Sequence, residues 1–364
     1  MHRREFLKSS SVAALAATGA AAIGPPATAT PRTPQPEAPA ILTRRRELRL
    51  VTRYEDRPSG NGDLARRLAA RIMAASEGAW RIDVETGGDG GIDVVRNGAA
   101  DLYLTIESDN GRAHPAFHYL AGLPCGVGLD GDAFEAWLTA AGGQDLWDEL
   151  AGPFDIKALA VGSTGPSHGV VCNRPIRERA DLKGLQICVD GLAREVLLAC
   201  DAVASTPQQH ELADALEQRL IDGAELLQAD FHFHDIQSGT RLWRAAHIMV
   251  PGLNRHGLTV ALGMRRGFWD QLANSERIML TALAAEARAM GRSELLAHQR
   301  TSEQMAVAPR PWMARPSSPA ELARDLESIA ATIVAEMSGR DAMTRRINAS
   351  YMAFRSQSAS QSTA

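Results

Sequence analysis

The sequence predicts an α/β protein of two lobes with a cleft between them. Short runs of alternating apolar and polar residues, typical of strands, interleave along the chain with segments that repeat apolar residues at helical spacing. Behind an N-terminal export segment about 335 residues remain, which is enough for two separate hydrophobic cores. The last part of the chain has helical patterns only, so long C-terminal helices should follow the two lobes.

Strands are expected where a short run alternates in polarity or is apolar between turn residues. The expected strands are 48–51, 80–84, 101–106, 156–161, 169–172, 185–189, 224–227, 247–250 and 258–263. The expected helices are 63–75, 132–150, 192–201, 211–220, 275–304 and 320–354. The last helix is preceded by Ser318 and Pro319 and has Glu321 in its first turn, which is a capping box with proline at the first helical position.

The first residues have the three parts of a twin-arginine export signal. Arg3 and Arg4 stand together, an uncharged apolar stretch covers residues 12–24, and Ala27 and Ala29 are small, as a signal peptidase requires. The apolar stretch is shorter than the roughly 20 residues that a membrane-spanning helix needs. We therefore expect cleavage after Ala29 and a mature protein in the periplasm, which begins with a proline-rich disordered linker that ends at residue 45.

The net charge and the spacing of the cysteines exclude some classes of function. The chain has a formal net charge of −4 and its export signal is positive, so the mature protein is acidic and is not expected to bind nucleic acid. Its cysteines, Cys125, Cys172, Cys188 and Cys200, have neither the close spacing of a metal knuckle nor that of a redox motif. Buried free thiols and a Cys172–Cys188 disulfide both remain open.

Several runs carry a family pattern when they are taken together. They are Asp-Leu-Lys-Gly-Leu-Gln-Ile at 181–187, the segment 215–225, the turn at 95–101, and Ser350-Tyr351 followed by Phe354. In order and spacing they resemble the extracytoplasmic solute receptors of tripartite ATP-independent periplasmic (TRAP) transporters, over nearly all of the mature chain. Residues 142–165 are most similar to the branch of that family that binds 2-oxo acids.

The resemblance implies a fold like that of the type II periplasmic binding proteins, in which two lobes close on one small organic anion. The receptor would deliver this ligand to the membrane permease subunits of the transporter, without catalysis. Lobe I would comprise residues 46–163 and 253–300, and lobe II residues 164–252. Residues 301–364 would form helices that pack across both lobes, with a disordered tail from about residue 356.

The expected ligand site departs from the family pattern. The carboxylate-binding Arg of the family is replaced by Cys188, and a thiol cannot pair with both carboxylate oxygens. A Gln that helps to hold a cation in the 2-oxo-acid branch is Ser167 here. The family's acidic residue is kept as Glu225, a candidate contact for the ligand or for a sodium or calcium ion bound with it. Arg255 is a candidate to restore the lost charge and to pair with Glu225 when the site is empty.

Further candidates for the cleft are polar residues near the ends of expected strands. Arg194, in the first turn of a helix, is a second candidate for the missing charge. Thr164 and His168 belong to a polar run between two strands, where hinge and cleft meet in the family. Arg53 follows the first strand, and strand ends carry ligands in such sheets. The alternative for each is a structural or solvent-exposed role.

The main functional hypothesis is a periplasmic receptor for a small organic acid, with no cofactor of its own. The alternative is a repurposed scaffold, either a sensor or a receptor for a ligand without a carboxylate, which Cys188 supports. An exported enzyme is disfavoured, because the sequence has no nucleophile–base pair and no cofactor fingerprint, and no third metal ligand accompanies the alternating His232 and His234. The extended C-terminal helix that members of the 2-oxo-acid branch swap between subunits has no counterpart, so a monomer is expected.

Overall fold

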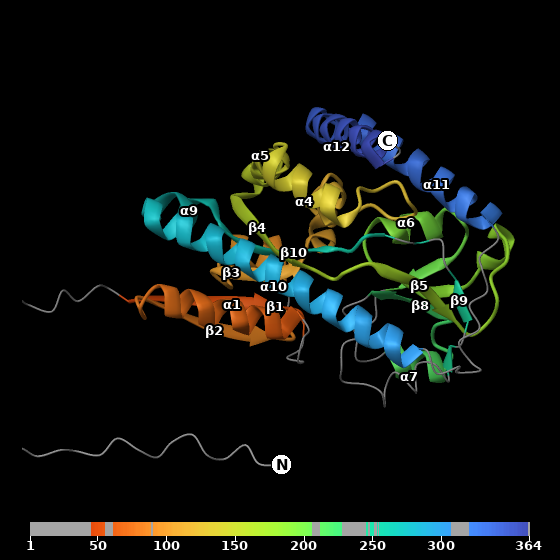
Figure 1. The fold of residues 1–364 in the computed structure, drawn as a ribbon, viewed down its shortest axis with the longest axis horizontal. Coiled ribbons are helices and arrows are strands. Elements are labelled where there is room, and N and C mark those ends of the chain that lie inside the picture. The colour runs from red at the N-terminus through yellow and green to blue at the C-terminus, as the bar shows by residue number, and fades with distance from the viewer. Residues whose placement is uncertain are drawn as a thin grey trace, which may run out of the picture. The chain divides into compact units, whose positions relative to one another are not determined.

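The computed structural model describes residues 45–54, 61–88, 90–205, 212–227, 245–246, 248–250, 253, 255–306 and 320–362. The export signal, nearly all of the linker and the two alternating histidines lie outside the described residues. Thr43–Ala364 is one compact unit. Its described part contains two five-stranded sheets, each with helices on both faces (Figure 1). The predicted two-lobed α/β class is therefore confirmed.

The sheet of lobe I has the strand order β2–β1–β3–β10–β4. Its strands are β1 (Arg46–Thr52), β2 (Trp80–Thr86), β3 (Leu102–Ile106), β4 (Ile156–Ser163) and β10 (Thr259–Arg265). β1 is parallel to β2 and β3, whereas β10 comes from far along the chain and is antiparallel to β3 and β4. Gly263 permits this pairing, because a Cβ at that position would lie 2.0 Å from the ring of Tyr103.

Helices cover both faces of the lobe I sheet. One face packs against α1 (Asn61–Ala75) and α10 (Asn274–Ala306), and α9 (Arg266–Gln271) leads from β10 into α10. The other face is covered by α2 (Ile92–Arg96), α3 (Phe117–Ala121), α4 (Gly131–Ala140) and α5 (Gly143–Ala151). In the described part of the chain no helix has the length and apolar composition of a membrane span.

The single helix predicted over 132–150 is wrong, because α4 and α5 are separate helices. Gly142 lies between them with a φ of +84°, a left-handed conformation that ends a helix and favours glycine. The turn lets α5 pack at a new angle, with Trp147 fully buried in the core.

The sheet of lobe II has the order β7–β6–β8–β5–β9. Its strands are β5 (Ser167–Cys172), β6 (Gln186–Cys188), β7 (Val203–Ser205), β8 (Gly223–Leu227) and β9 (Ile248–Val250). The helix α6 (Leu192–Leu198) packs on one face of this sheet and α7 (Leu212–Glu217) on the other. β7 was not predicted, because its sequence, Val-Ala-Ser, contains only one residue that favours strands.

Two crossing segments connect the lobes and are bonded to each other. Thr164 lies in the first and Leu258 in the second, and the Thr164 N–H donates to the Leu258 carbonyl at 2.9 Å. The Leu258 N–H donates in turn to the Thr164 hydroxyl at 2.9 Å. Gly257, with a φ of +126°, allows this close approach, because a Cβ there would lie 2.5 Å from Ser163 Oγ. The two segments therefore form one hydrogen-bonded hinge.

The C-terminal helices bridge the lobes. Leu322 and Leu326 of α11 (Ala320–Gly339) join the core on the α6 side of lobe II, and α12 (Ala342–Ser362) packs on lobe I, as Figure 1 shows. One helix to residue 354 with a disordered tail was predicted. Instead Asp341 caps a new helix by accepting from the Thr344 N–H at 2.8 Å, and α12 continues beyond residue 356.

Tyr351 is the main contact of α12 with lobe I. Its hydroxyl accepts a hydrogen bond from the Leu129 N–H at 2.8 Å, and the side chain is fully buried. Its ring packs edge-on against the rings of Trp137 and Tyr119, with centroids 5.1 and 5.6 Å away. This aromatic cluster fixes α12 on the helical face of lobe I.

Glu107 holds the short 3-10 helix η1 (Glu107–Arg112), which follows β3, against the core. Its carboxylate accepts from Trp147 Nε1 at 3.0 Å and from Asn110 Nδ2 at 3.1 Å, and it is fully buried. Burial raises the pKa of Glu107 to about 8. The network sets the position of Ser108 and Asp109, the next two residues of η1.

Replacing Tyr351 by Phe should lower the free energy of unfolding by about 1–3 kcal/mol, because the buried Leu129 N–H loses its acceptor. Chemical denaturation with urea measures this change. The variant Arg345→Ala, at an exposed position of the same helix, is the control and should unfold like the wild type. Equal midpoints for Tyr351→Phe and the control would contradict the assigned hydrogen bond.

Replacing Glu107 by Gln should make the melting temperature less dependent on pH. Because the folded-state pKa of Glu107, about 8, exceeds the ordinary value of 4.5, the folded state holds a proton that the unfolded state releases between these values. The contribution of this group to stability therefore falls as the pH rises through that window. Differential scanning calorimetry at a series of pH values should show a shallower fall for Glu107→Gln than for the wild type. The exposed Glu47→Gln should keep the wild-type slope, and a wild-type slope in Glu107→Gln would refute the assignment.

Candidate functional site

A buried ion pair joins the second crossing segment to the sheet of lobe II. Arg255 precedes the hinge residue Leu258, and Glu225 lies in β8. Arg255 Nε donates to Glu225 Oε1 at 3.0 Å, and Nη2 donates both to Glu225 Oε2 and to the carbonyl of Asp190 at 3.0 Å. The two side chains are 0% and 2% exposed. The pairing that the sequence suggested for an empty site is therefore present.

Three buried polar atoms near this pair have no hydrogen-bond partner among the described residues. They are Arg255 Nη1, Ser108 Oγ and His118 Nδ1. A Cβ on Gly191 would lie 3.2 Å from Arg255 Nη1 and 3.2 Å from Ser108 Cβ, so the two lobes meet at this glycine. Burial, reinforced by the charge of Arg255, lowers the pKa of His118 to about 4, so His118 is neutral near pH 7. The junction of the lobes thus has unused capacity for hydrogen bonds.

A second guanidinium bridges the lobes beside the first. Arg53 Nη1 lies 2.9 Å from Asp109 Oδ1 of η1, and Nη2 lies 3.7 Å from Asp190 Oδ2 of lobe II. The guanidinium also lies over the ring of Tyr54, 5.2 Å from its centroid. Burial raises the pKa of Asp109, and the charge of Arg53 opposes that shift. Arg53 therefore lies at the junction of the lobes, and its role as a ligand contact stays a prediction.

Cys188 faces away from the ion pair. It lies beside Ala224 in the register of β6 and β8, and both pack into the apolar cluster with Leu212 and Leu216 of α7. Successive side chains of a strand point to opposite faces, so Glu225 lies on the other face of the sheet. The Cys188 thiol therefore does not lie beside Glu225, where it could take the role of the missing Arg. None of the four cysteines is in a disulfide.

The other predicted site residues are used differently. The Thr164 hydroxyl belongs to the hinge, and Ser167 Oγ accepts from the Gly169 N–H at 3.2 Å within β5. Arg194 Nε is buried without a hydrogen-bond partner in the described part of the chain. His168 lies in β5, and its side chain is outside the described part. Their roles as ligand contacts stay predictions.

Apart from Arg53, sequence reasoning missed the lobe I side of the site, and it also missed the loop after β6. Ser108, Asp109, His118 and Asp190 were not among the candidates. A signal was available for three of them: Ser108 and Asp109 are the second and third residues after the apolar strand β3, and Asp190 directly follows the run predicted as a strand at 185–189. Polar residues at strand ends are the usual ligand contacts of α/β sheets.

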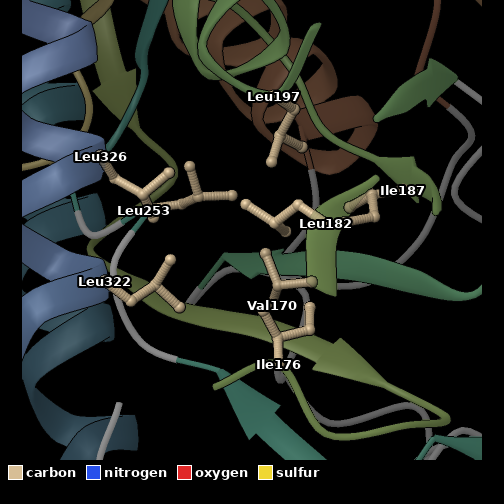
Figure 2. Close-up of a pocket in the computed structure, with 8 residues that line it drawn as sticks. All are labelled: Val170, Ile176, Leu182, Ile187, Leu197, Leu253, Leu322 and Leu326. Atoms are coloured by element: carbon tan, nitrogen blue, oxygen red, sulfur yellow. The ribbon is translucent and has the colours of Figure 1, made fainter. Parts of the chain in front are cut away.

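An apolar pocket in lobe II is not a candidate for an acidic ligand. Figure 2 shows Leu322 and Leu326 of α11 facing Leu253, with Val170 and Leu197 farther in. All the lining side chains are aliphatic, so the pocket offers a carboxylate no hydrogen bond from a side chain. It belongs to the core between α11 and the lobe II sheet.

Comparison with known proteins places the chain in a family. Residues 60–333 match the model of the bacterial extracellular solute-binding proteins, family 7 (DctP). The monocarboxylate 2-oxoacid-binding periplasmic protein all3028 of Nostoc sp. is 24% identical over 229 residues, and the chain spans 61% of that relative's length.

Solved structures have the same fold. A TRAP periplasmic solute-binding protein from Pseudoalteromonas atlantica T6c, with bound sodium and pyruvate, superposes with a TM-score of 0.79 at 20% identity, over 87% of this chain and 96% of that one. A second TRAP periplasmic solute-binding protein, from Colwellia psychrerythraea with bound calcium and pyruvate, superposes with a TM-score of 0.79 at 19% identity, over 87% of this chain and 96% of that one. Because the family model covers most of the chain, as the motifs predicted, the protein belongs to the DctP family of extracellular solute-binding proteins, the solute receptors of TRAP transporters.

Proposed function

We propose that the protein is a periplasmic TRAP receptor that captures a small organic acid, first of all a 2-oxo acid, between its lobes and delivers it to a membrane permease. The observation that carries this proposal is the buried Arg255, which holds Glu225 with one edge and keeps Nη1 unpaired at the lobe junction. The ligands named for the relatives, 2-oxo acids and pyruvate, support the same class of substrate.

The unpaired atoms fit the polar groups of a 2-oxo acid. Nη1 of Arg255 donates to the carboxylate in a charge-assisted hydrogen bond. The Ser108 hydroxyl and the neutral His118 ring lie on the lobe I side and can satisfy the remaining oxygens. Glu225 and the Asp190 carbonyl keep the guanidinium in place before the ligand arrives, which lowers the entropy cost of binding.

A ligand that contacts both lobes favours the closed state of the protein. A solute held by Arg255 on one side and by Ser108 on the other has its full set of contacts only when the lobes meet. Binding therefore shifts the population toward the closed state. The Arg53 bridge between Asp109 and Asp190 adds an attraction across the same junction.

A thermal-shift screen of the mature protein tests this proposal. Pyruvate and other small carboxylates should raise the melting temperature, because a ligand that binds only the folded state stabilises it by mass action. Neutral solutes of the same size should leave it unchanged. No response to any carboxylate from a well-folded protein would refute the proposal and favour a repurposed scaffold.

The double variant Arg255→Met/Glu225→Gln should weaken the binding of the responding acid more than tenfold, because a hydrogen bond to a charged group contributes about 1.5–3 kcal/mol. Both residues are changed because removing one partner leaves a buried unpaired charge, at a cost of roughly 3–5 kcal/mol in stability. Isothermal titration calorimetry measures the affinity. The control is Arg346→Met/Glu149→Gln, which removes an exposed ion pair and should bind like the wild type. Unchanged affinity in the Arg255 variant would sink the assignment of Arg255.

The proposal includes export by the twin-arginine pathway and cleavage after Ala29. Protein recovered from the periplasm should therefore begin at Thr30, as intact-mass spectrometry can establish. The variant Arg3→Lys/Arg4→Lys should leave the uncleaved precursor in the cytoplasm. Normal processing of that variant would instead indicate another export route.

A further inference from the structure

The structural neighbours bind pyruvate together with sodium or calcium. Glu225 is the residue of this chain that the sequence offers as a ligand for such an ion, so its surroundings test whether an ion fits. Both oxygens of Glu225 accept hydrogen bonds from Arg255, and the side chain is 2% exposed. A metal ion at Glu225 would have to displace a buried guanidinium. The residues present therefore do not fit a metal.

The other carboxylates at the junction also lie beside a guanidinium, in contacts that are more exposed than that of Glu225. Asp109 and Asp190 lie on either side of Arg53, at 2.9 and 3.7 Å. Calcium takes six to eight oxygen ligands, yet the described residues contain no group of three or more His, Cys, Asp or Glu side chains that could hold a metal. The Ser167 hydroxyl, at the position of the family's cation-holding Gln, accepts from the Gly169 N–H within its own strand.

We propose that the Arg255 guanidinium takes the place of the metal ion, so that this receptor binds its acid without sodium or calcium. This inference rests on the proposed function. The guanidinium is planar and has several donors. Its Nε and Nη2 bind Glu225, and Nη1 remains for the ligand, so it bridges the protein carboxylate and the ligand carboxylate as an ion would.

Electrostatics favours replacement of the metal ion by the guanidinium over a site that holds both cations. A guanidinium and a metal ion on the same buried carboxylate would repel each other in a medium of low dielectric constant. A permanent side-chain cation also removes the dependence on ion concentration, since it is always present and always charged. The lost Arg at Cys188 and the lost ion would then have a single substitute.

The first experiment titrates metal-stripped wild-type protein with pyruvate, in a sodium-free buffer, with and without added calcium chloride or sodium chloride. Affinities by calorimetry should agree within about twofold, apart from the small screening that added salt produces. Binding that requires either cation, or that tightens about tenfold or more with it, overturns the inference but leaves the receptor function intact. If another acid gave the larger thermal shift, it replaces pyruvate in the titration.

The second experiment removes the side-chain cation. In Arg255→Gln the carboxylate of Glu225 is released, so calcium chloride should raise the melting temperature of this variant, whereas the wild type should not respond. Arg346→Gln, which breaks an exposed pair with Glu149, should also not respond. A calcium response in the wild type that disappears in Glu225→Gln overturns the inference.

The calcium titration of the wild type needs no organic acid and no new variant to fold. If no acid binds under any condition, the proposed function fails, and this titration still tests whether the Arg255 guanidinium excludes a metal ion from Glu225. Absence of a calcium response in the metal-stripped wild type supports the resident guanidinium. A stoichiometric calcium site at Glu225 contradicts it.

Discussion

The site depends on the burial of one guanidinium against one carboxylate. Arg255 and Glu225 are almost completely shielded from water, and neither charge would be tolerated there without the other. The pair, with the Asp190 carbonyl as a third partner, joins the second crossing segment, β8 and the loop after β6. The same crossing segment is hydrogen-bonded to Thr164 of the first crossing segment, so the ion pair lies next to the connection between the lobes.

Other carboxyl groups near the Arg255–Glu225 pair also depend on neighbouring side chains. Arg53 pairs with Asp109 and lies 3.7 Å from Asp190 across the junction. Glu107, which has no such partner, is held by two neutral donors, and burial shifts its pKa upward instead. Glu225 is therefore fully paired with its own arginine, whereas Asp109 and Asp190 share one. This supports a receptor whose positive charge is built into the chain and partly used before the ligand arrives.

The fold could be predicted well because most strands and helices have a clear hydrophobic periodicity in the sequence. The strands 48–51 and 156–161 and the helix 63–75 lie where their periodicity put them. Breaks within helices were missed at Gly142 and Asp341, because a local turn leaves the apolar spacing almost intact. Strand β7 was missed because Val-Ala-Ser contains only one residue that favours strands.

The site was predictable only in part. Glu225 and Arg255 were proposed as partners because an anion site needs a positive charge and the usual Arg was absent. Their meeting required the crossing of segments that are 30 residues apart in sequence, which no local pattern encodes. Ser108 and His118 reach the junction only through the tertiary packing of η1 and α3. The change of ligand chemistry that Cys188 suggested stays a prediction, and its thiol lies on the opposite face of the sheet from Glu225.

A crystal structure of the mature protein grown with the acid that gives the largest thermal shift tests the central claim most directly. The account predicts the ligand carboxylate within hydrogen-bond distance of Arg255 Nη1, with Glu225 still paired to Nε and Nη2 and with Ser108 on the lobe I side of the ligand. A carboxylate bound elsewhere in the cleft, with the Arg255–Glu225 pair out of its reach, would contradict it.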